Sequence, residues 1–582
     1  MSVNQHFDTD VLVIGTGPAG STLGLALANY GIKVHLFTQF NWLANSPRAH
    51  ITNQRAMEVL RDLGVEEQVK EIATPWEDMG ESLLTTSLVG EEIARMSSWG
   101  AGDQRHGDYV QGSPCPLVDL IQPKMEALLV KNAAERGAIY HFNTEYLSHI
   151  QDNDGVTATF RNVVTKQEFS LRAKYLIGMD GARSKIVDQL NLPLEGVLAR
   201  AGTVYVTFNA DLSQYVKHRP AILQWIVNPE TSFGDLGMGL LRAITPWNQW
   251  IMGWGFDISK GEPEITESLV RTRLDAFVGV KVEDVKIDKV SYWYVNQSWA
   301  TNYSVGRVFC GGDAVHRHPP SSGLGSNTCM QDAFNLGWKL AYVLKGWASE
   351  SLLDSYTTER APVGKQIVER ANQSRFDYQY LKDVFGFNQG IKTQKEMLER
   401  IFAESEQGAI IREKLFEALK VKNYEFNGQG VELNQRYCSN AIVSETEEEI
   451  FQRDVQLYLQ ATTRPGAKIP HVWLVDTKGE KRSSLDIIGK GRFTLLTGLS
   501  GTEWKNAAES LNLEYLDIIQ IGSKEYRDVY GSWNDKSEVH ESGAIVVRPD
   551  GYVAWRMKDK PEIGFDYKKT LREVLSQIQL NT

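Results

Sequence analysis

Apolar runs and helix-period patterns alternate along the first part of the chain. Thr9–Ile14 is almost continuously apolar and precedes a segment with apolar residues at helical spacing, which Gly31 ends. Lys33–Phe37 is a second apolar run. Apolar runs separated by an amphipathic helix are typical of buried parallel strands in a βαβ unit. The pattern therefore predicts an α/β fold that begins with a Rossmann-like unit.

The remaining segments predict further layers of structure. Leu120–Arg136 has the pattern of an amphipathic helix, and aromatic-rich strands are expected over residues 202–256. Long helices are expected up to about residue 373, whereas residues 376–449 have a less regular, charge-rich pattern. From about residue 454, strands and helices alternate again. The predicted class is α/β (α+β overall), with a Rossmann-like domain, an inserted β-sheet domain and a compact C-terminal α/β unit.

Composition and charge narrow the classes of function. A chain of 582 residues is too long for one hydrophobic core, and at roughly 150 residues per domain it suggests about three or four units. The net charge of -11 and the lack of a Lys/Arg run argue against a nucleic-acid partner. No signal peptide is evident, and no apolar run approaches the ~20 residues that span a bilayer. We therefore expect a cytoplasmic protein without a membrane or nucleic-acid partner.

The cysteines form no recognisable site. Cys115, Cys310, Cys329 and Cys438 lie far apart and make neither a CxxC motif nor a metal-ligand spacing. Reduced thiols of this kind fit a cytosolic protein, and the sequence predicts no bound metal.

A glycine-rich motif follows the first predicted strand. Gly15, Gly17 and Gly20, with Pro18 and Ala19 between them, form GxGxxG, and the predicted helix follows at once. In this setting the motif binds the pyrophosphate of a dinucleotide at the helix N-terminus. A tight structural turn between strand and helix is the alternative interpretation.

The second predicted strand ends where dinucleotide-binding folds usually carry an acidic residue for the ribose. Thr38 stands at that position and Gln39 follows it. Either side chain can hydrogen-bond a hydroxyl group, so we expect a ribose contact without a carboxylate.

The stretch from Arg307 to Trp338 combines a short apolar strand, a Gly-Gly-Asp turn, a Pro-rich crossing, a glycine-punctuated loop and a long helix. Glycine and proline at this density are strong signals of a loop. The helix opens with Gly325, Ser326 and Asn327, whose free backbone N–H groups suit an anion or a polarised carbonyl. We predict that a flavin ring binds here.

Two further groups of residues are candidates for chemistry. Arg48 and His50 lie in a loop before a helix that Thr52 is predicted to cap. A loop histidine is often only a surface residue, but this loop is expected to face the first βα unit. Trp225 and Arg242 lie among the aromatic-rich strands, which form either a core or the apolar wall of a substrate pocket.

Three motifs in this order carry a family resemblance: Gly15–Gly20, Asp180-Gly181 and Gly312-Asp313-Ala314. Asp180-Gly181 alone would indicate a plain turn, but the three together resemble the single-component FAD-dependent aromatic hydroxylases. Longer segments look close to the phenol-hydroxylating branch, in particular the chlorophenol and 2-hydroxybiphenyl 3-monooxygenases. These segments are Pro47–Gly64, Gly311–Leu340 and Arg464–Leu474.

The resemblance implies a monooxygenase that uses FAD, NADPH or NADH, and O₂. It implies hydroxylation of a phenol, including a halogenated or aryl-substituted one, ortho to the hydroxyl group by a flavin C4a-hydroperoxide. It also implies a homo-oligomer, either a dimer or a tetramer. Two alternatives remain at this point: a flavin dehydrogenase or oxidase without oxygen insertion, and a non-catalytic Rossmann-type binding protein.

The resemblance also implies roles for individual residues. His50 would be the base that activates the phenol, and Trp225, Arg242 and Pro320 would contact the substrate. Asp313 would bind the ribitol hydroxyls, and Asp180 belongs to a motif shared between FAD and nicotinamide handling. The residues implied to bind the cofactor are Gly15, Gly17, Pro18, Ala19, Gly20, Thr38, Gln39, Arg48, Gln122, Asp180, Asp313, Pro320, Gly323, Gly325, Ser326 and Asn327.

The domain division implied by the resemblance is discontinuous. The FAD-binding domain would comprise residues 1–75, 106–188 and 286–400, and the substrate-binding domain residues 76–105 and 189–285. Residues 401–582 would form a linker and a thioredoxin-like domain. Because the chain has no CxxC motif, that domain is not expected to exchange disulfides, and packing and dimer support are its expected roles.

Overall fold

The computed structural model describes residues 6–47, 49–231 and 233–582. Its central layer is an eight-stranded sheet in which β1 (Thr9–Ile14) pairs in parallel with β2 (Val34–Phe37) and with β10 (Glu168–Gly178). The remaining strands of this sheet are β7 (Ile139–His141), β8 (Thr144–Gln151), β9 (Val156–Asn162), β18 (Ser304–Val305) and β19 (Val308–Cys310). β1 has no exposed surface at its centre, as expected of a parallel strand covered on both faces. The predicted Rossmann-like α/β unit is confirmed.

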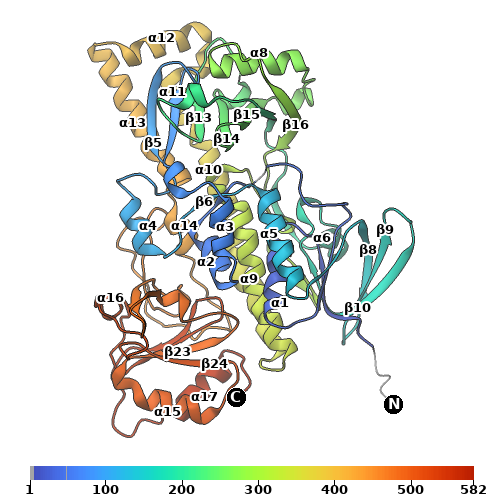
Figure 1. Ribbon diagram of the computed structural model, residues 1–582, viewed down its shortest axis with the longest axis vertical. Helices are drawn as coiled ribbons and strands as arrows, with labels where there is room; N and C mark the ends of the chain where they lie inside the picture. The colour runs from blue at the N-terminus through green and yellow to red at the C-terminus, as the bar shows by residue number, and fades with distance from the viewer. Residues whose placement is uncertain (1–5, 48, 232) are drawn as a thin grey trace.

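Three helices surround the start of this sheet (Figure 1). α1 (Pro18–Asn29) contacts both α5 (Gln122–Glu135) and α9 (Gly325–Leu344). α1 and α9 are therefore neighbours, although most of the first half of the chain separates them. Each of these two helices begins within or directly after one of the glycine-rich segments described above, Gly15–Gly20 for α1 and the loop before Gly325 for α9.

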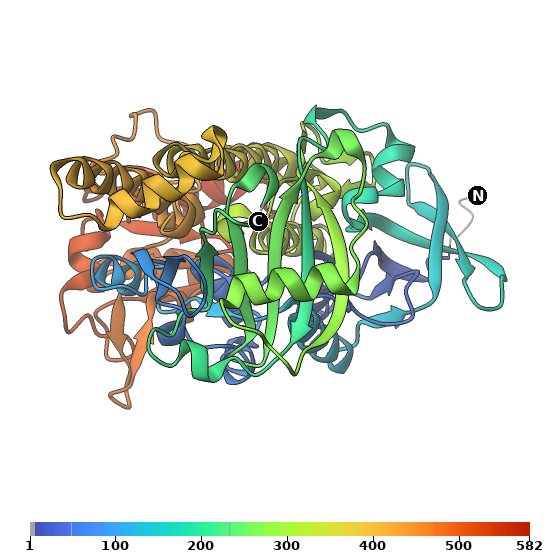
Figure 2. The same ribbon diagram turned by 90° about the horizontal axis from the view of Figure 1, so that it is seen from above.

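A second, seven-stranded sheet lies above the first in Figure 1. Its order is β16 (Lys286–Tyr294), β12 (Gly202–Asn209), β15 (Gln249–Phe256), β14 (Gly239–Thr245), β13 (Leu223–Ile226), β4 (Glu81–Thr85) and β5 (Glu92–Ser97). α8 (Glu267–Val278) lies across one face (Figure 2), where Leu274 and Phe277 pack with Val204 and Val206 of β12. The strands predicted over residues 202–256 are confirmed.

The segment after α10 (Asp354–Phe376) is helical, so the less regular pattern expected over residues 376–449 is wrong as far as residue 433. It forms α11 (Tyr378–Phe385), α12 (Ile391–Phe402), α13 (Glu406–Phe426) and α14 (Gln429–Leu433). Leu381 and Leu415 from this segment pack with Trp225 of the second sheet in one hydrophobic cluster. These helices have many charged positions because each presents a broad face to solvent.

Residues 462–582, the C-terminal unit, form a four-stranded sheet with helices beside it. The strand order is β24 (Leu516–Gln520), β23 (Phe493–Thr497), β25 (Ala544–Val547) and β26 (Val553–Met557). β23 and β24 are parallel and joined through α15 (Thr502–Leu511), the other pairs are antiparallel, and α17 (Tyr567–Gln577) follows. With α16 (Ser532–Lys536) between β24 and β25, the element order is βαβαββα, which agrees with the thioredoxin-like expectation. Among the helices of the described residues, none is both long and apolar enough to cross a bilayer.

Candidate active site

The N-terminus of α1 is open to a ligand. Gly17 is the N-cap, and the first turn has neither a side-chain cap nor an acidic residue, so its backbone N–H groups are available. A Cβ atom on Gly15 would lie 2.0 Å from the Met179 carbonyl oxygen, and one on Gly20 would lie 1.9 Å from the Gly15 carbonyl oxygen. Among the described residues, a Cβ atom on Gly17 would meet nothing closer than Glu126 Oε1 at 3.8 Å, so the turn faces open space. This geometry fits a pyrophosphate.

A second open helix terminus lies beside the first. α9 begins at Gly325 without a side-chain cap and without an acidic residue in its first turn. The side chain of Asn327 is not free, because its amide donates to the carbonyl of Ile51 at 2.8 Å and its oxygen accepts from the N–H of Asn53 at 3.0 Å. Asn327 thus ties the start of α9 to the segment that follows His50.

A cavity of about 380 Å³ lies between these loops and the second sheet. It brings together residues that are far apart in the sequence but share a predicted role. The predicted residues that line it are Pro18, His50, Gln122, Trp225, Arg242, Asp313, Pro320, Gly323, Gly325 and Ser326. The helical segment that the sequence did not predict adds Tyr378, Glu425 and Phe426 to the lining.

Strand alternation explains the wall of the cavity. Thr203, Tyr205 and Thr207 of β12 line it, whereas Val204 and Val206 between them belong to the core under α8. β13 and β14 contribute every second residue in the same way, with Trp225 and Arg242 among them. Because side chains of a strand point alternately to opposite faces, one face of this sheet is core and the other is cavity.

His50 is held opposite a buried aspartate. β3 (Ile51–Thr52) pairs with β6 (Val118–Asp119), and the N–H of Leu120 donates to the His50 carbonyl at 2.8 Å. His50 Nδ1 lies 3.5 Å from Asp119 Oδ1, and Asp119 is only 3% exposed. Arg242 donates to the other oxygen of Asp119. His50 and Arg242 therefore line the cavity, and the buried Asp119 behind them completes a His50–Asp119–Arg242 cluster.

Burial and charge set the protonation states of this cluster. Burial lowers the pKa of His50, the positive charge of Arg242 lowers it further, and Asp119 opposes both effects. Burial raises the pKa of Asp119, but Arg242 and His50 outweigh it and leave that pKa below its usual value. The structure thus supports a neutral imidazole beside an ionised carboxylate and a guanidinium.

Asp119 was not predicted from the sequence. It lies in the run Leu117-Val118-Asp119-Leu120, where a single acidic residue is surrounded by apolar ones. A buried carboxylate of this kind needs a charged partner. An isolated acidic residue in an apolar run is therefore the sequence signal that could have identified Asp119.

Asp313 and its turn face the cavity. The side chain of Asp313 is exposed and lines the cavity. The preceding residue, Gly312, donates its N–H to Asp332 Oδ2 at 3.0 Å. Cys329 Sγ lies 3.6 Å from Asp313 Oδ1. Asp313, His316 and Cys329 each have a potential metal-ligand atom within 4.8 Å of the other two. Burial raises the pKa of the Cys329 thiol well above its usual value, and Asp313 adds to the rise, which disfavours a thiolate ligand.

Several predicted residues lie outside the cavity lining. Thr38 Oγ1 accepts from the N–H of Phe40 at 3.3 Å, and Gln39 is exposed. Gln122 does line the cavity, but its amide donates to Glu126 Oε1 at 2.6 Å. Asp180 lies behind Gly15 and accepts from the N–H of Lys185 at 3.0 Å.

The loop around His50 differs from its prediction at the start of the helix that follows it. Arg48 lies outside the described residues. The predicted cap Thr52 is wrong by one position, because Asn53 caps α2 (Gln54–Asp62) and accepts from the N–H of Ala56 at 2.9 Å. Thr52 is instead part of β3, where it pairs with β6.

Comparison with known proteins agrees with this geometry. The family model described as FAD binding domain matches residues 8–371, and the model described as aromatic-ring hydroxylase, C-terminal, matches residues 462–579. The chain belongs to the FAD-dependent aromatic-ring hydroxylases. It is therefore a flavin-dependent monooxygenase, which uses FAD, a reduced pyridine nucleotide and O₂. The dehydrogenase and the non-catalytic alternatives receive no support.

Similar proteins extend over nearly the whole chain. The 2,4-dichlorophenol 6-monooxygenase of Cupriavidus pinatubonensis is 46% identical over 98% of this chain and 97% of its own. The phenol 2-monooxygenase of a Pseudomonas species is 42% identical over 94% of this chain and 90% of its own. The solved structure of the flavin-dependent monooxygenase PieE with FAD and substrate has a TM-score of 0.93, 38% identity, and coverage of 99% of this chain and 100% of its own. The family resemblance found in the sequence is confirmed.

Replacing Asp313 by alanine should weaken FAD binding. The side chain faces the cavity beside both helix N-termini, and a hydrogen bond to a charged group contributes about 1.5–3 kcal/mol, so affinity should fall by about tenfold or more. FAD retained per chain after gel filtration measures the effect. Asp313→Asn, which keeps an acceptor oxygen, should retain more FAD than Asp313→Ala; full retention by Asp313→Ala would contradict the ribitol assignment.

Proposed function

We propose that this enzyme hydroxylates a phenol at a ring carbon ortho to the hydroxyl group, with His50 as the base. The observation that carries the proposal is the His50–Asp119–Arg242 cluster, whose His50 and Arg242 line the same cavity as the two open helix N-termini. The names of the 2,4-dichlorophenol and phenol monooxygenase relatives support a phenolic substrate.

The residues around the two loops would hold FAD. Bound FAD supplies electron transfer from NADH or NADPH and the activation of O₂. In the proposed arrangement, the turn from Gly15 to Gly20 would bind the pyrophosphate, and Asp313 would bind the ribitol hydroxyls. The backbone N–H groups of residues 325–327 would hold the pyrimidine carbonyls, with Pro320 and Gly323 beside the flavin. Supporting contacts are proposed for Thr38, Gln39, Arg48, Gln122 and Asp180.

His50 would polarise the phenol rather than deprotonate it fully. A phenol near pKa 10 and a histidine near 6.5 differ by roughly 3.5 units, which costs about 5 kcal/mol. Burial lowers the pKa of His50 and widens this gap. The guanidinium of Arg242 compensates, because a positive charge at the cavity stabilises a developing phenolate. Electron-withdrawing substituents such as chlorine lower the pKa of the phenol and should ease the step.

The apolar wall supports an aromatic substrate. Trp225 is 8% exposed, and its ring packs at 4.7 Å, centroid to centroid, against Tyr378. Leu223, Leu240 and Ile251 line the same side of the cavity. Phenols, halophenols and hydroxybiaryls match this lining. A screen of such phenols for stimulated NAD(P)H oxidation, scored against product formed, tests the proposal; stimulation without product from any phenol would overturn it.

Replacing His50 by alanine should leave FAD bound but reduce hydroxylation. A general base contributes about 100-fold or more, so turnover to product near neutral pH should fall by at least that factor. Product formation under saturating phenol, with flavin absorbance as the check on cofactor content, measures both effects. An unchanged rate of hydroxylation in His50→Ala would remove His50 as the base.

The charge of Arg242 should control the pH profile. His50 accepts a proton only when neutral, so hydroxylation is lost as pH falls through its pKa. Arg242 lowers that pKa, and Arg242→Met should therefore raise it and move the acid limb of kcat/KM to higher pH. Arg242→Lys keeps the charge and should leave the limb closer to its original position. A limb that stays in place or moves to lower pH in Arg242→Met would contradict this assignment.

We also propose a homo-oligomer, either a dimer or a tetramer, located in the cytoplasm. The support for the assembly is the likeness to the phenol-hydroxylating branch, and the support for the location is the use of a reduced pyridine nucleotide. Sedimentation equilibrium of the purified enzyme tests the assembly, and a monomer at micromolar concentration would overturn it.

A further inference from the structure

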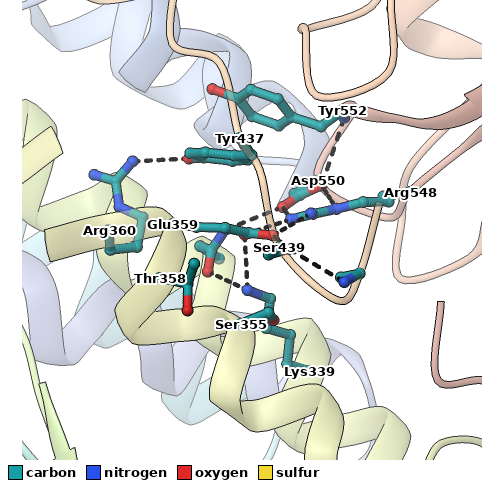
Figure 3. A network of polar contacts seen from close by, with 12 residues as sticks. Lys339, Ser355, Thr358, Glu359, Arg360, Tyr437, Ser439, Arg548, Asp550 and Tyr552 are labelled. Carbon is teal, nitrogen blue, oxygen red and sulfur yellow. Dashed lines mark hydrogen bonds and ion pairs between the residues drawn. The ribbon is translucent and has the colours of Figure 1, made fainter. Parts of the chain in front are cut away.

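A buried ionic network joins the C-terminal unit to helices α9 and α10 (Figure 3). Arg548 donates to both carboxylate oxygens of Glu359 in α10, at 2.6 and 2.9 Å, and Lys339 of α9 lies 2.8 Å from the same carboxylate. All three side chains have no exposed surface. Buried charges are costly unless they are fully paired, so this junction tolerates little displacement of one partner relative to the others.

Asp550 extends the network to two helices of the site. Its carboxylate accepts from Trp338 Nε1 at 3.1 Å and from Asn335 Nδ2 at 3.4 Å, both in α9. Its backbone carbonyl accepts from Arg55 of α2 at 2.8 Å. A single turn of the C-terminal unit therefore binds both α9 and α2.

The first connection runs through α2 toward His50. Arg55 lies in the first turn of α2, where it also pairs with Glu58 at 3.0 Å. Lys468 of the C-terminal unit binds the same Glu58 at 2.9 Å. α2 follows His50 almost directly, and its N-cap Asn53 is bonded to the first turn of α9. A shift of α2 that breaks the Asn53–Asn327 bond would therefore move His50 relative to the loop that opens α9.

The second connection runs through α10 toward Asp313. Arg360 donates to Asp332 Oδ1 at 2.7 Å and to the Tyr437 hydroxyl at 2.8 Å. The ring of Tyr437 stacks on that of Tyr552 of the C-terminal unit, with centroids 4.2 Å apart. Both side chains are labelled in Figure 3. The other oxygen of Asp332 accepts the N–H of Gly312, the residue before Asp313. The turn that presents Asp313 is therefore bonded to a side chain that the C-terminal unit helps to hold.

We propose that the C-terminal unit is a positioning element for the hydroxylation reaction. Through Arg55 it fixes the place of His50, and through Arg360 it fixes the turn of Gly312 and Asp313, so the base and the flavin site keep their separation. Arginine suits both positions because its planar group makes several directed hydrogen bonds at once, which lysine cannot reproduce. The inference rests on the proposed function, since it uses the roles of His50 and Asp313.

Three matched substitutions of arginine by lysine test this inference. Arg55→Lys and Arg360→Lys keep the buried charge but shorten the reach of the side chain. Arg556→Lys is the control, because Arg556 is also buried and pairs with Glu445 and Glu538, which lie outside α2, α9 and α10. The measurements on the holoenzyme are the melting temperature, the rate of FAD loss on dilution, and the product formed per NAD(P)H oxidised with 2,4-dichlorophenol as the probe.

Arg55→Lys should lower the ratio of product to NAD(P)H by about tenfold, because a small misplacement of a reacting group is sufficient for such a loss. Its FAD should be retained as in the wild type. Arg360→Lys should instead accelerate FAD loss by about tenfold, since it loosens the turn before Asp313. Arg556→Lys should change the melting temperature without either effect. Equal changes in all three variants, or changes in melting temperature alone, would overturn the proposal.

A milder variant covers the case in which Arg55→Lys does not fold. Asp486→Asn weakens the partly exposed pair with Arg61, at 2.7 Å, which joins the C-terminal unit to the other end of α2. It should lower the product ratio in the same direction, and an unchanged ratio would count against the first connection. If the wild type hydroxylates no phenol, the proposed function fails, whereas the rate of FAD loss from Arg360→Lys relative to Arg556→Lys still decides the second connection.

Discussion

Two helices, α1 and α9, begin next to one another at the edge of the parallel sheet, and the first turn of each leaves its backbone N–H groups without a side-chain cap. Unsatisfied donors at a helix N-terminus favour negative charge and polarised carbonyl oxygens. In an FAD-dependent enzyme, these two ends can share one extended cofactor, from its pyrophosphate to its flavin edge. The packing of α1 on α9 and the glycine turn at Gly15 both serve to keep these ends together.

The second sheet completes the site by presenting opposite chemistry on its two faces. One face is core under α8, and the other supplies the aromatic wall and the Arg242 guanidinium. Arg242 then links this wall to Asp119, which belongs to the first part of the chain. The Arg242–Asp119 ion pair thus spans the boundary between the sheet that lines the cavity and the segment beside His50.

Local sequence signals predicted the parts of the fold that depend on backbone geometry. Gly15 and Gly20 could be recognised because a side chain at either position would collide with the backbone within the same turn or the adjoining loop. The aromatic strands could be recognised from alternation and composition. Helices α11–α13 could not be recognised, because their many charged outer positions obscure the short apolar stripes. Those stripes pack against the second sheet, which the local sequence does not reveal.

The site itself was only partly predictable. Local sequence context marks His50, Asp313 and Arg242 as candidates and the family resemblance implies their roles, whereas Asp119 becomes visible only when β3 and β6 are paired. The network around Glu359, Arg548 and Asp550 had no local signature, since its members come from three distant segments and are recognised by their mutual burial. Pairing of this kind is a property of tertiary structure, and it links the C-terminal unit to the site in a way that composition does not indicate.

The central claim is that this cavity inserts oxygen from O₂ into a phenol. The most direct measurement is mass spectrometry of the product formed from 2,4-dichlorophenol under ¹⁸O₂ with purified holoenzyme and NADPH or NADH. We expect a catechol that carries one ¹⁸O atom, placed ortho to the original hydroxyl. Complete recovery of the oxidised NAD(P)H equivalents as hydrogen peroxide, with no labelled product from this or any other phenol, would contradict it.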